Sequence, residues 1–327
     1  MLYSFIIPVY NRPDELLELL ESITQQTHQN FEVVIIEDGS EQSSEAVVRS
    51  FQDRLDIAWY PTTGRIGQGF SRNLGFTKAK GDYFIILDSD TTIDPDYLEN
   101  LDRHLNEHEL DAFGGPDRSP RVATPVQQAI DYCMTSPFTT GGIRGRKNQV
   151  DKFYPRSFNM GFSREVYEAT QGFNLPYLGE DIELSTRIME KGFSTGLVPD
   201  SPVYHKRKTS FLNFYKQIHF FGRARVNLYK LFPHTLKLPH LFPAVYLCYF
   251  GTAAVGTVIL TRKGHRKGAL LLAPWALYQL LIFTHATMTK KSLKVGLLST
   301  IGVNVQMIGY GAGFIQDFVK RVVLKKK

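Results

Sequence analysis

Two aspartates in the N-terminal half have the type and spacing of metal ligands. Asp88 and Asp90 follow the apolar run Tyr83–Leu87, so both carboxylates are expected on a short turn at the end of a buried strand. Mg²⁺ and Mn²⁺ take hard oxygen ligands of this kind and usually keep water and phosphate oxygens in their shell. Asp-x-Asp alone recurs in many surface turns, so it is the position after a strand that favours a metal site.

A second acidic pair, Glu180 and Asp181, begins a run with helical spacing of apolar residues that extends to Lys191. Carboxylates at a helix start can simply complement the helix dipole, and a positioned carboxylate can also act as a general base. His205 stands beside three cations at 206–208 and is either a surface residue or a ligand. These residues, taken alone, leave both alternatives open.

Three common catalytic motifs are either absent or outside the structural context that they require. Gly67–Arg72 begins like the dinucleotide fingerprint G-x-G-x-x-G, but Arg72 replaces the third glycine, and the segment lies far beyond the first strand–helix turn. The Walker motif G-x-x-x-x-G-K-[ST] does not occur. Gly-x-Ser-x-Gly is matched once, at Gly192–Gly196, but this segment follows the helical run that ends at Lys191, whereas a nucleophile elbow follows a strand. The sequence therefore argues against a Rossmann dehydrogenase, a P-loop NTPase and a nucleophile-elbow hydrolase.

The elements around these residues predict an α/β fold with a mostly parallel sheet. Apolar runs at 2–9, 31–36, 57–60 and 83–87 alternate with runs of helical spacing that begin at Pro13 and Gly67. Such alternation typically gives parallel strands with helices on both faces, and ligands bind beyond the C-terminal ends of the strands. Residues 110–174 show no clean period, and we expect an antiparallel extension there that receives a second substrate.

The charge changes sign along the chain. Residues 1–200 contain 18 Lys and Arg against 31 Asp and Glu, whereas residues 201–327 contain 20 against one. The basic part includes three apolar segments without Asp, Glu, Lys or Arg, at Leu241–Leu260, Ala269–Thr289 and Val295–Gln316. Each is long enough to cross a hydrocarbon core of about 30 Å. Buried helices of a soluble domain would need charged outer faces, which these segments lack, so we expect membrane association.

The loops between the apolar segments are all basic. Three full spans cannot keep every one of these loops on one side of a bilayer, so we expect one segment to be re-entrant or to lie in the interface. Before them, residues 206–230 carry seven Lys and Arg and no acid, interleaved with aromatic residues. This composition favours an amphipathic collar on an anionic leaflet. Single-stranded nucleic acid is the competing interpretation, but the apolar segments that follow favour a bilayer and no nucleic acid.

Five motifs, taken in order, resemble those of family 2 glycosyltransferases of the GT-A fold. They are Phe5-Ile6-Ile7-Pro8-Val9-Tyr10-Asn11, Ile35-Ile36-Glu37-Asp38-Gly39-Ser40, Ser71-Arg72-Asn73-x-Gly75, Leu87-Asp88-Ser89-Asp90 and Gly179-Glu180-Asp181-x-Glu183-Leu184. The resemblance covers about residues 1–230. Segments 217–225 and 309–314 are similar to the membrane-anchored, succinoglycan-type branch. We therefore expect a GT-A domain at 1–205, a basic interfacial collar at 206–235 and a membrane region with two or three hydrophobic helices at 236–327.

The resemblance implies inverting transfer from a nucleotide-diphosphate sugar, with a UDP-sugar favoured. On the nucleotide side, Asp38 would accept a hydrogen bond from the base, and Pro8 and Tyr10 would pack nearby. The family usually has an aspartate immediately before this residue, where the chain has Glu37. The longer acid is compatible with nucleotide contact at this loop, and we assign no direct role to Glu37 itself.

The resemblance assigns a second set of residues to the diphosphate and to a bound Mg²⁺ or Mn²⁺. Arg72 would face the diphosphate, and Asp88 would contact the ribose or metal-bound water. Asp90 would ligate the metal that bridges the two phosphates, and His205 would be a further ligand of the metal or the diphosphate. Such a metal neutralises the leaving diphosphate as a Lewis acid.

On the acceptor side, the resemblance implies that Asp181 is the general base and that Glu180 orients the acceptor or the base. The signature Q-x-x-R-W of processive polysaccharide synthases is missing, because the chain has Gln217 followed by Ile-His-Phe-Phe. We therefore expect the transfer of one sugar per reaction rather than polymer extrusion.

These observations predict a glycosyltransferase at the inner membrane of the cell with its catalytic domain on the cytoplasmic face, since no signal peptide is visible before the first strand. The expected acceptor is a lipid-linked glycan in the assembly of a cell-surface polysaccharide. Two alternatives remain at this point. One is transfer directly to a polyprenyl phosphate, and the other is a catalytically inactive membrane scaffold.

Overall fold

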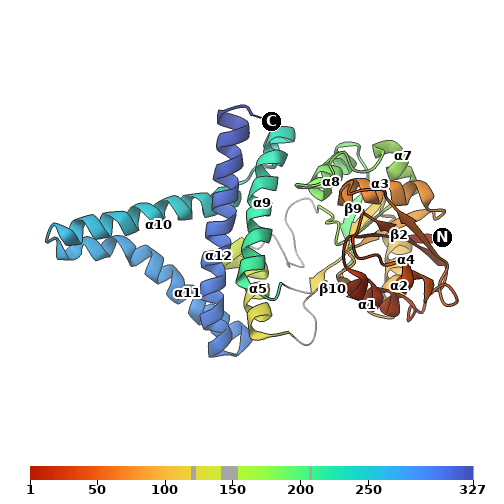
Figure 1. Ribbon diagram of the computed structural model, residues 1–327, viewed down its shortest axis with the longest axis horizontal. Coiled ribbons are helices and arrows are strands. Elements are labelled where there is room, and N and C mark those ends of the chain that lie inside the picture. Colours follow the sequence, from red (N-terminus) through yellow and green to blue (C-terminus); the bar gives the residue numbers. More distant parts are fainter. Residues whose placement is uncertain (119–122, 141–153, 206–207, 327) are drawn as a thin grey trace. The chain divides into compact units, whose positions relative to one another are not determined.

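The computed structural model describes residues 1–118, 123–140, 154–205 and 208–326 (Figure 1). These residues form two compact units. Unit 1 contains 1–118 and 154–205, and unit 2 contains 123–140 and 208–326. Residues 123–140 lie inside the range 1–205 expected for the first domain. They group with the C-terminal helices because α5 (Pro125–Thr135) packs on α12 (Leu293–Phe318).

Unit 1 is built on a seven-stranded sheet with the order β3-β2-β1-β4-β8-β6-β9. Strands β1 to β4 are mutually parallel, β8 runs antiparallel to both of its neighbours, and β6 is parallel to β9. The strands are β1 (Tyr3–Val9), β2 (Phe31–Glu37), β3 (Ile57–Pro61), β4 (Tyr83–Leu87), β6 (Ala112–Gly114), β8 (Asn159–Ser163) and β9 (Thr195–Leu197). The predicted α/β fold with a mostly parallel sheet is confirmed.

Helices cover both faces of this sheet (Figure 1). Successive side chains of β1 point to opposite faces, so that Phe5 and Ile7 join one core and Ile6 joins the other. The first core lies under α1 (Pro13–Ile23), α2 (Glu45–Arg49) and α4 (Tyr97–His108). The second lies under α3 (Gln68–Lys78), α7 (Arg164–Thr170) and α8 (Glu180–Glu190). Because the central strands are buried on both faces, their sequences are continuous apolar runs.

A small second sheet joins segments that are far apart in the chain. Its order is β5-β10-β7, with β5 at Thr91–Ile93, β7 at Asp117–Arg118 and β10 at Val203–His205. In the antiparallel pairing of β10 with β5, His205 lies opposite Thr91. The register of this short sheet therefore places His205 opposite Thr91, the residue that directly follows Asp90.

The expected antiparallel extension at 110–174 is realised in part. Strand β8 is antiparallel to β4 and β6, as predicted. The segment also contains helices that we did not expect, namely α5, α6 (Pro137–Thr140) and α7. Residues 119–122 and 141–153 lie outside the described part of the chain. A role in receiving a second substrate remains a prediction.

Unit 2 is helical. Besides α5, α6 and α12, it contains α9 (Phe211–Leu231), η1 (Pro233–Thr235), α10 (Leu238–Arg262), η2 (Arg266–Leu272), α11 (Ala273–Lys290) and the short π-helix η3 (Val319–Val323). Two stretches of the described chain are long and apolar enough to cross a membrane, Leu238–Arg262 and Lys267–Lys290. The third apolar segment of the sequence forms α12, which is not among them.

Glycines let α9 and α12 approach each other closely. A Cβ added at Gly222 would lie 2.2 Å from the carbonyl oxygen of Tyr310, and one added at Gly313 would lie 2.2 Å from that of His219. Small residues commonly allow such close helix contacts. Beside this contact, Asp317 is buried and paired with Arg223 at 3.1 Å. The two C-terminal segments that carry the branch resemblance, 217–225 and 309–314, thus form one interface.

This contact makes Gly222 sensitive to the smallest substitution. We expect Gly222→Ala to destabilise unit 2 by about 1–3 kcal/mol, because the added methyl group meets backbone atoms of Tyr310 and Phe314 that cannot rotate away. The melting temperature of the full chain measures this. Gly251→Ala on α10 is the matched control, since a Cβ there meets no atom within 4 Å. Equal melting temperatures for the two variants would contradict the close packing of α9 on α12.

Candidate functional site

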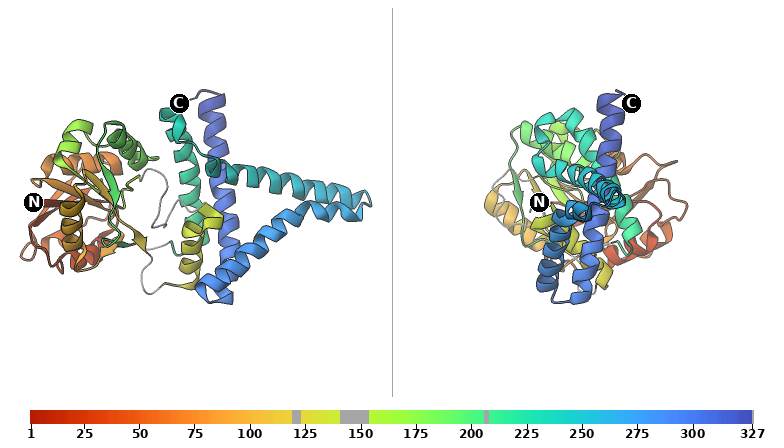
Figure 2. Two further views of the ribbon diagram at one scale, coloured as in Figure 1. Left: turned by 180° about the vertical axis from the view of Figure 1, so that it is seen from behind. Right: turned by 90° about the vertical axis from the view of Figure 1, so that its left-hand side faces the viewer.

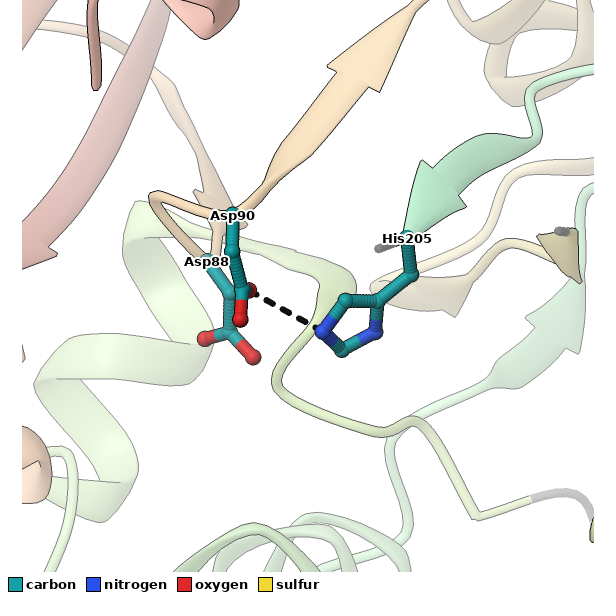
Figure 3. Close-up of side chains that lie close together, drawn as sticks. All are labelled: Asp88, Asp90 and His205. Atoms are coloured by element: carbon teal, nitrogen blue, oxygen red, sulfur yellow. Dashed lines mark ion pairs between the residues drawn. The ribbon is translucent and has the colours of Figure 1, made fainter. Parts of the chain in front are cut away.

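Asp88, Asp90 and His205 form a cluster at the C-terminal edge of the large sheet (Figure 3). Each residue offers one ligand atom, and these atoms lie within 4.8 Å of one another. The two aspartates stand on the turn between β4 and β5, and His205 ends β10. His205 Nε2 lies 3.0 Å from Asp90 Oδ1. The structure therefore brings the three predicted metal ligands together, although 115 residues separate Asp90 from His205.

Two arginines neutralise part of this acidic cluster. Arg12, at the start of α1, forms a short ion pair with Asp90 Oδ2. Arg72, which is fully buried on α3, donates to Asp88 Oδ1 at 2.8 Å. The pKa of Asp88 is nevertheless raised, because burial and the charge of Asp90 outweigh the effect of Arg72. Burial alone would lower the pKa of His205, but the hydrogen bond and charge of Asp90 raise it.

The residues of this cluster fit a divalent cation. Two carboxylates and an imidazole are a donor set that Mn²⁺ and Mg²⁺ accept. Burial, together with the charge of Asp90, raises the pKa of Asp88, and a bound cation would offset both effects. Within the described residues, the Nδ1 atom of His205 is buried without a hydrogen-bond partner and lies 3.9 Å from Asp117 Oδ1. Asp88, Asp90 and His205 would hold the ion.

Arg12 and a cation would compete for the same carboxylate. We expect Arg12→Gln to tighten Mn²⁺ binding about three- to tenfold, because an ion pair worth roughly 1 kcal/mol no longer has to be broken. The substitution removes no helix cap, since the Arg12 side chain makes no capping bond to α1. Titration calorimetry with MnCl₂ measures the effect. The control is Arg49→Gln, which breaks the exposed pair with Glu45 and should leave the affinity unchanged. Weaker binding in Arg12→Gln would instead mean that Arg12 supports the site.

The second acidic pair begins α8, as the sequence predicts. Leu178 and Gly179 have φ angles of +66° and +91°, and this left-handed turn ends at Glu180. Such a conformation is strained for leucine and accessible to glycine. Asp181 Oδ2 accepts from Arg156 Nε at 2.7 Å, and Oδ1 accepts from the Ile182 amide at 2.8 Å. Both acids are buried at the helix N-terminus.

Arg72 connects the two acidic groups. Its Nη2 donates to Asp88 at 2.8 Å and its Nη1 to Glu180 at 3.3 Å. Glu180 also accepts a short hydrogen bond from Gln68 on α3. The cluster of Asp88 and Asp90 and the pair of Glu180 and Asp181 therefore share one buried guanidinium. Arg72 contacts carboxylates in this structure, and its predicted contact with a diphosphate remains a prediction.

The pKa values of Glu180 and Asp181 are shifted in opposite directions. Burial and the neighbouring charge of Asp181 raise the pKa of Glu180. The charge of Arg72 lowers this pKa, but by less than the other two effects raise it. Burial would also raise the pKa of Asp181, but the charge of Arg156 and the bond from the Ile182 amide outweigh it and lower this pKa. Asp181 is therefore the acid of this pair that stays ionised most readily.

Loops after β1 and β2 position the residues predicted to bind a nucleotide. Pro8 and Tyr10 are half-buried at the end of β1. The Arg65 guanidinium lies 4.0 Å from the centroid of the Tyr10 ring. Asp38 Oδ1 accepts from the Ile66 amide at 2.7 Å, and its Oδ2 accepts from the Gly67 amide at 3.0 Å. Asp38 thus shapes the loop that carries Arg65, and its contact with a base remains a prediction.

Glu37 holds the loop that follows β2. Its Oε2 accepts from the Ser44 amide at 2.7 Å, from the Ser44 hydroxyl through a short bond, and from Trp59 Nε1 at 3.3 Å. The side chain is buried. The longer acid that departs from the family pattern therefore anchors the start of α2, which accounts for a glutamate at this position.

Sequence reasoning missed several residues of the site. Arg12 has a weak signal, since it follows the first strand by three positions. No sequence signal pointed to Arg156 or Asp117, because both lie in residues 110–174, where the sequence shows no regular spacing of apolar residues. Arg65 stands in a loop between two expected elements. The predicted acids were recognisable in the sequence because each one follows a predicted strand or starts a predicted helix. The arginines of the site occupy no common position relative to the predicted elements.

Known proteins are similar to this chain in sequence and in fold. A sequence profile of glycosyl transferase family 2 matches residues 4–170, about half of the chain, from β1 to α7. Among curated relatives, GlyG of Streptococcus pneumoniae is 32% identical over 117 residues, and a Haemophilus influenzae glycosyltransferase without an assigned role is 39% identical over 140. These alignments cover 35% and 40% of this chain and 38% and 55% of the relatives, so the chain matches only part of each relative.

Two solved structures share the fold. The mannosyltransferase PcManGT from Pyrobaculum calidifontis, in complex with GDP-Man and Mn²⁺, superposes with a TM-score of 0.64 at 19% identity, covering 93% of this chain and 86% of the other. Residues 1–349 of S. aureus TarS with UDP-GlcNAc give a TM-score of 0.52 at 15% identity, covering 100% and 93%. At these identities the likeness shows the fold alone, which is of the GT-A type. On the match of its N-terminal half, the chain belongs to glycosyl transferase family 2.

Proposed function

We propose that this protein is a membrane-associated, inverting glycosyltransferase that moves one sugar from a nucleotide-diphosphate sugar to a hydroxyl group of an acceptor at the membrane surface. The observation that carries this proposal is the link through Arg72 between the cluster of Asp88, Asp90 and His205 and the pair of Glu180 and Asp181. A scaffold without catalysis has no need of five titratable groups gathered at the ligand-binding edge of the sheet.

Asp181 acts as the general base. The acceptor hydroxyl gives its proton to Asp181 Oδ2 as its oxygen attacks the anomeric carbon, and the bond from that carbon to the diphosphate oxygen breaks with its electrons going to the diphosphate. A carboxylate oxygen can accept two hydrogen bonds, so Oδ2 can keep Arg156 and still receive the hydroxyl. Glu180 stays with Arg72 and Gln68 and orients this site.

Asp88, Asp90 and His205 would hold a divalent cation at the donor side, with Mg²⁺ or Mn²⁺ as candidates. Such a metal would supply Lewis-acid stabilisation of the leaving diphosphate, worth several kcal/mol. Arg12, which forms an ion pair with Asp90, places a further positive charge on the same side of the site. Asp38 holds the loop that brings Arg65 to Tyr10, where the base is expected.

The pH profile distinguishes Asp181 from Glu180 as the base. A base is active above its pKa and loses activity as the pH falls through it. The pKa of Asp181 is held below the ordinary value of about 3.9, so we expect no acid limb in kcat/KM between pH 5 and 8. The pKa of Glu180 is raised above about 4.3, so a base at Glu180 could give an acid limb between pH 5 and 8. If such a limb is observed and disappears in Glu180→Gln, the base is Glu180 and not Asp181.

The membrane part of the proposal is supported by α10 and α11, whose most apolar windows are only 11% buried in the structure. A core helix of a soluble protein would be mostly buried, and an N-terminal signal sequence would not stand at residue 238. The proposed location is the cytoplasmic face of the inner membrane, and the proposed acceptor is a lipid-linked glycan of cell-surface polysaccharide assembly. Transfer directly to a polyprenyl phosphate fits the same residues.

The test is a panel of nucleotide sugars bound to the detergent-solubilised full chain with Mn²⁺ present. The panel includes GDP- and UDP-sugars, because PcManGT was solved with GDP-Man and TarS with UDP-GlcNAc. We expect one donor to bind and to be consumed when membrane extract supplies the acceptor. Polyprenyl phosphate and lipid-linked glycan, offered separately, distinguish the two acceptor classes. A panel in which no donor binds would favour the scaffold.

A further inference from the structure

Helices α10 and α11 form a hairpin within unit 2 (Figure 2). Near its tip the two legs are in contact. Thr257 Oγ1 donates to the Gly268 carbonyl at 3.1 Å, and a Cβ added at Gly268 would lie 2.7 Å from the Leu260 side chain. The 25 residues of α10 rise about 37 Å, which exceeds the hydrocarbon thickness of about 30 Å. The hairpin is therefore long enough to reach across a bilayer.

At the other end, the legs separate and α12 crosses between them. The start of α10 packs on Gly311, where a Cβ would lie 2.5 Å from the Pro243 carbonyl oxygen. The end of α11 packs on Gly296, where a Cβ would lie 2.0 Å from the Thr287 hydroxyl. These two glycines are 15 residues, or about 22 Å, apart on α12. Because α12 joins both legs at their base, it lies across the hairpin rather than beside it as a third span (Figure 1).

Polar side chains between the legs satisfy one another. Tyr246 on α10 donates to Asn304 on α12 at 2.5 Å and accepts from Trp275 on α11 at 2.9 Å. Asn304 in turn donates to Gln279 at 2.8 Å. Unsatisfied polar groups are costly in hydrocarbon, and hydrogen bonds of this kind hold membrane helices together. The inside of the hairpin is therefore compatible with burial in lipid.

Lysines and arginines stand at both ends of the hairpin, and the parts of its two legs between these ends contain no Asp, Glu, Lys or Arg. No Asp, Glu, Lys or Arg occurs between Lys237 and Arg262 or between Lys267 and Lys290. Four cations gather at the tip, Arg262, Lys263, Arg266 and Lys267. A lysine or arginine at the bilayer centre costs at least about 2.5 kcal/mol on insertion scales, so four of them cannot stop inside the hydrocarbon. The tip must lie in one headgroup layer and the base in the other.

The distribution of charge decides which end faces the cytosol. Thirteen described Lys and Arg residues lie on the side of α9 and α12, in 208–237, 290–294 and 320–326, against the four at the tip. Lys and Arg near membrane segments favour the cytosolic side. Lys208, the first cation of the larger group, stands three residues after the end of β10 in unit 1. A link of three residues reaches at most about 11 Å, which is too short to cross a bilayer, so we infer that unit 1 and the larger group are on the same side of the membrane.

We propose that α10 and α11 cross the bilayer as a hairpin whose tip at 263–267 emerges on the face opposite the catalytic unit, with α9 and α12 along the near face. This inference rests on the proposed membrane association. This arrangement explains how the chain can have three apolar segments and still keep most of its basic loops on one side of the membrane. Only the short loop between α10 and α11 reaches the other side. The bilayer it fits is one with an anionic near leaflet, which the thirteen cations attract.

The test is labelling of introduced cysteines in spheroplasts with a maleimide that does not cross membranes. The background is the full chain with Cys248→Ala, since Cys133 is buried and Cys248 is exposed on α10. His265→Cys and Lys263→Cys report the tip, and Lys294→Cys, an exposed position at the base, is the matched control. We expect the two tip positions to be labelled in intact spheroplasts at more than half the level seen after permeabilisation. Lys294→Cys should be labelled only after permeabilisation.

Three outcomes have distinct meanings. Tip labelling only after permeabilisation would overturn the transmembrane hairpin in favour of a hairpin that stays on the near face. Labelling of Lys294→Cys in intact spheroplasts would overturn the orientation. Carbonate extraction of the same samples tests the underlying association, because a chain found in the soluble fraction would refute the membrane proposal itself. Donor binding by each variant confirms that unit 1 is folded in the labelled protein.

Discussion

Asp181→Asn is expected to reduce kcat at least about a hundredfold while leaving donor binding within a few-fold of the unaltered protein. Asparagine has nearly the same shape and can still accept from the Ile182 amide, but it cannot take a proton from the acceptor. A positioned general base contributes about 10²–10⁴-fold. Product formation at saturating donor measures kcat, and titration calorimetry with the donor and Mn²⁺ measures binding.

The control for this prediction lies on the same turn of α8. Glu183 is also buried near the helix N-terminus, where it pairs with Arg187 at 2.6 Å and accepts from Asn174 at 3.1 Å. If Asp181 only complements the helix dipole, Asp181→Asn and Glu183→Gln should both lower the melting temperature and neither should change kcat strongly. Near-normal turnover in Asp181→Asn would therefore refute its assignment as the base.

Asp90→Asn is expected to weaken Mn²⁺ binding and to lower activity, each by at least about a hundredfold. Asp90 is the carboxylate that both Arg12 and His205 contact, so its loss removes the central negative charge of the cluster. Lewis-acid stabilisation worth several kcal/mol corresponds to two or more orders of magnitude in rate. Treatment of the unaltered protein with EDTA should have the same effect on activity, and adding back Mn²⁺ or Mg²⁺ should restore it.

The matched control is Asp94→Asn, four residues along the chain. Asp94 accepts from the Tyr204 hydroxyl at 2.8 Å and is not part of the metal cluster. We expect it to change metal affinity by less than about twofold, since Asp94 supplies no atom to the ligand set. If activity survives thorough chelation, the site works without a metal, and Arg12 on Asp90 is then the cation that remains at the donor side.

The elements of unit 1 were predictable because local patterns encode them. The buried runs that became β1, β2 and β4 are continuous and apolar, since strands covered on both faces need no polar alternation. The position of Asp88 and Asp90 after β4 follows from that pattern. The start of α8 at Glu180 agrees with the helical spacing behind it.

The partners of these acids were not predictable in the same way. Arg156 reaches Asp181 because β8 inserts antiparallel beside β4, and the sequence around residue 156 has no clear period. Arg12 reaches Asp90 because β1 and β4 are neighbours in the sheet although α1, β2, α2, β3 and α3 separate them in the chain. Strand order and register depend on contacts between distant segments, and a local period contains no information about them.

The three C-terminal apolar segments show the same division. Composition alone made them look equivalent, yet α10 and α11 remain exposed while Gly302, Val303, Met307 and other residues of α12 are buried against neighbouring helices. Packing of α9 at Gly222 and Gly313 and of α5 at Gly302 buries α12, and the residues of α9 and α12 that meet are about 90 positions apart in the chain.

The family motifs, the α/β class, the acidic positions at strand ends and the change of charge near residue 200 can all be read from the chain without a structure. These features depend on residue types and spacings within one element or one turn, which local sterics and hydrophobic burial translate directly into structure. Three other features became visible in the folded molecule alone: His205 joins Asp88 and Asp90, Arg72 links them to Glu180, and α12 is packed across a hairpin. Those features depend on which surfaces bury one another, and burial is a property of the whole fold.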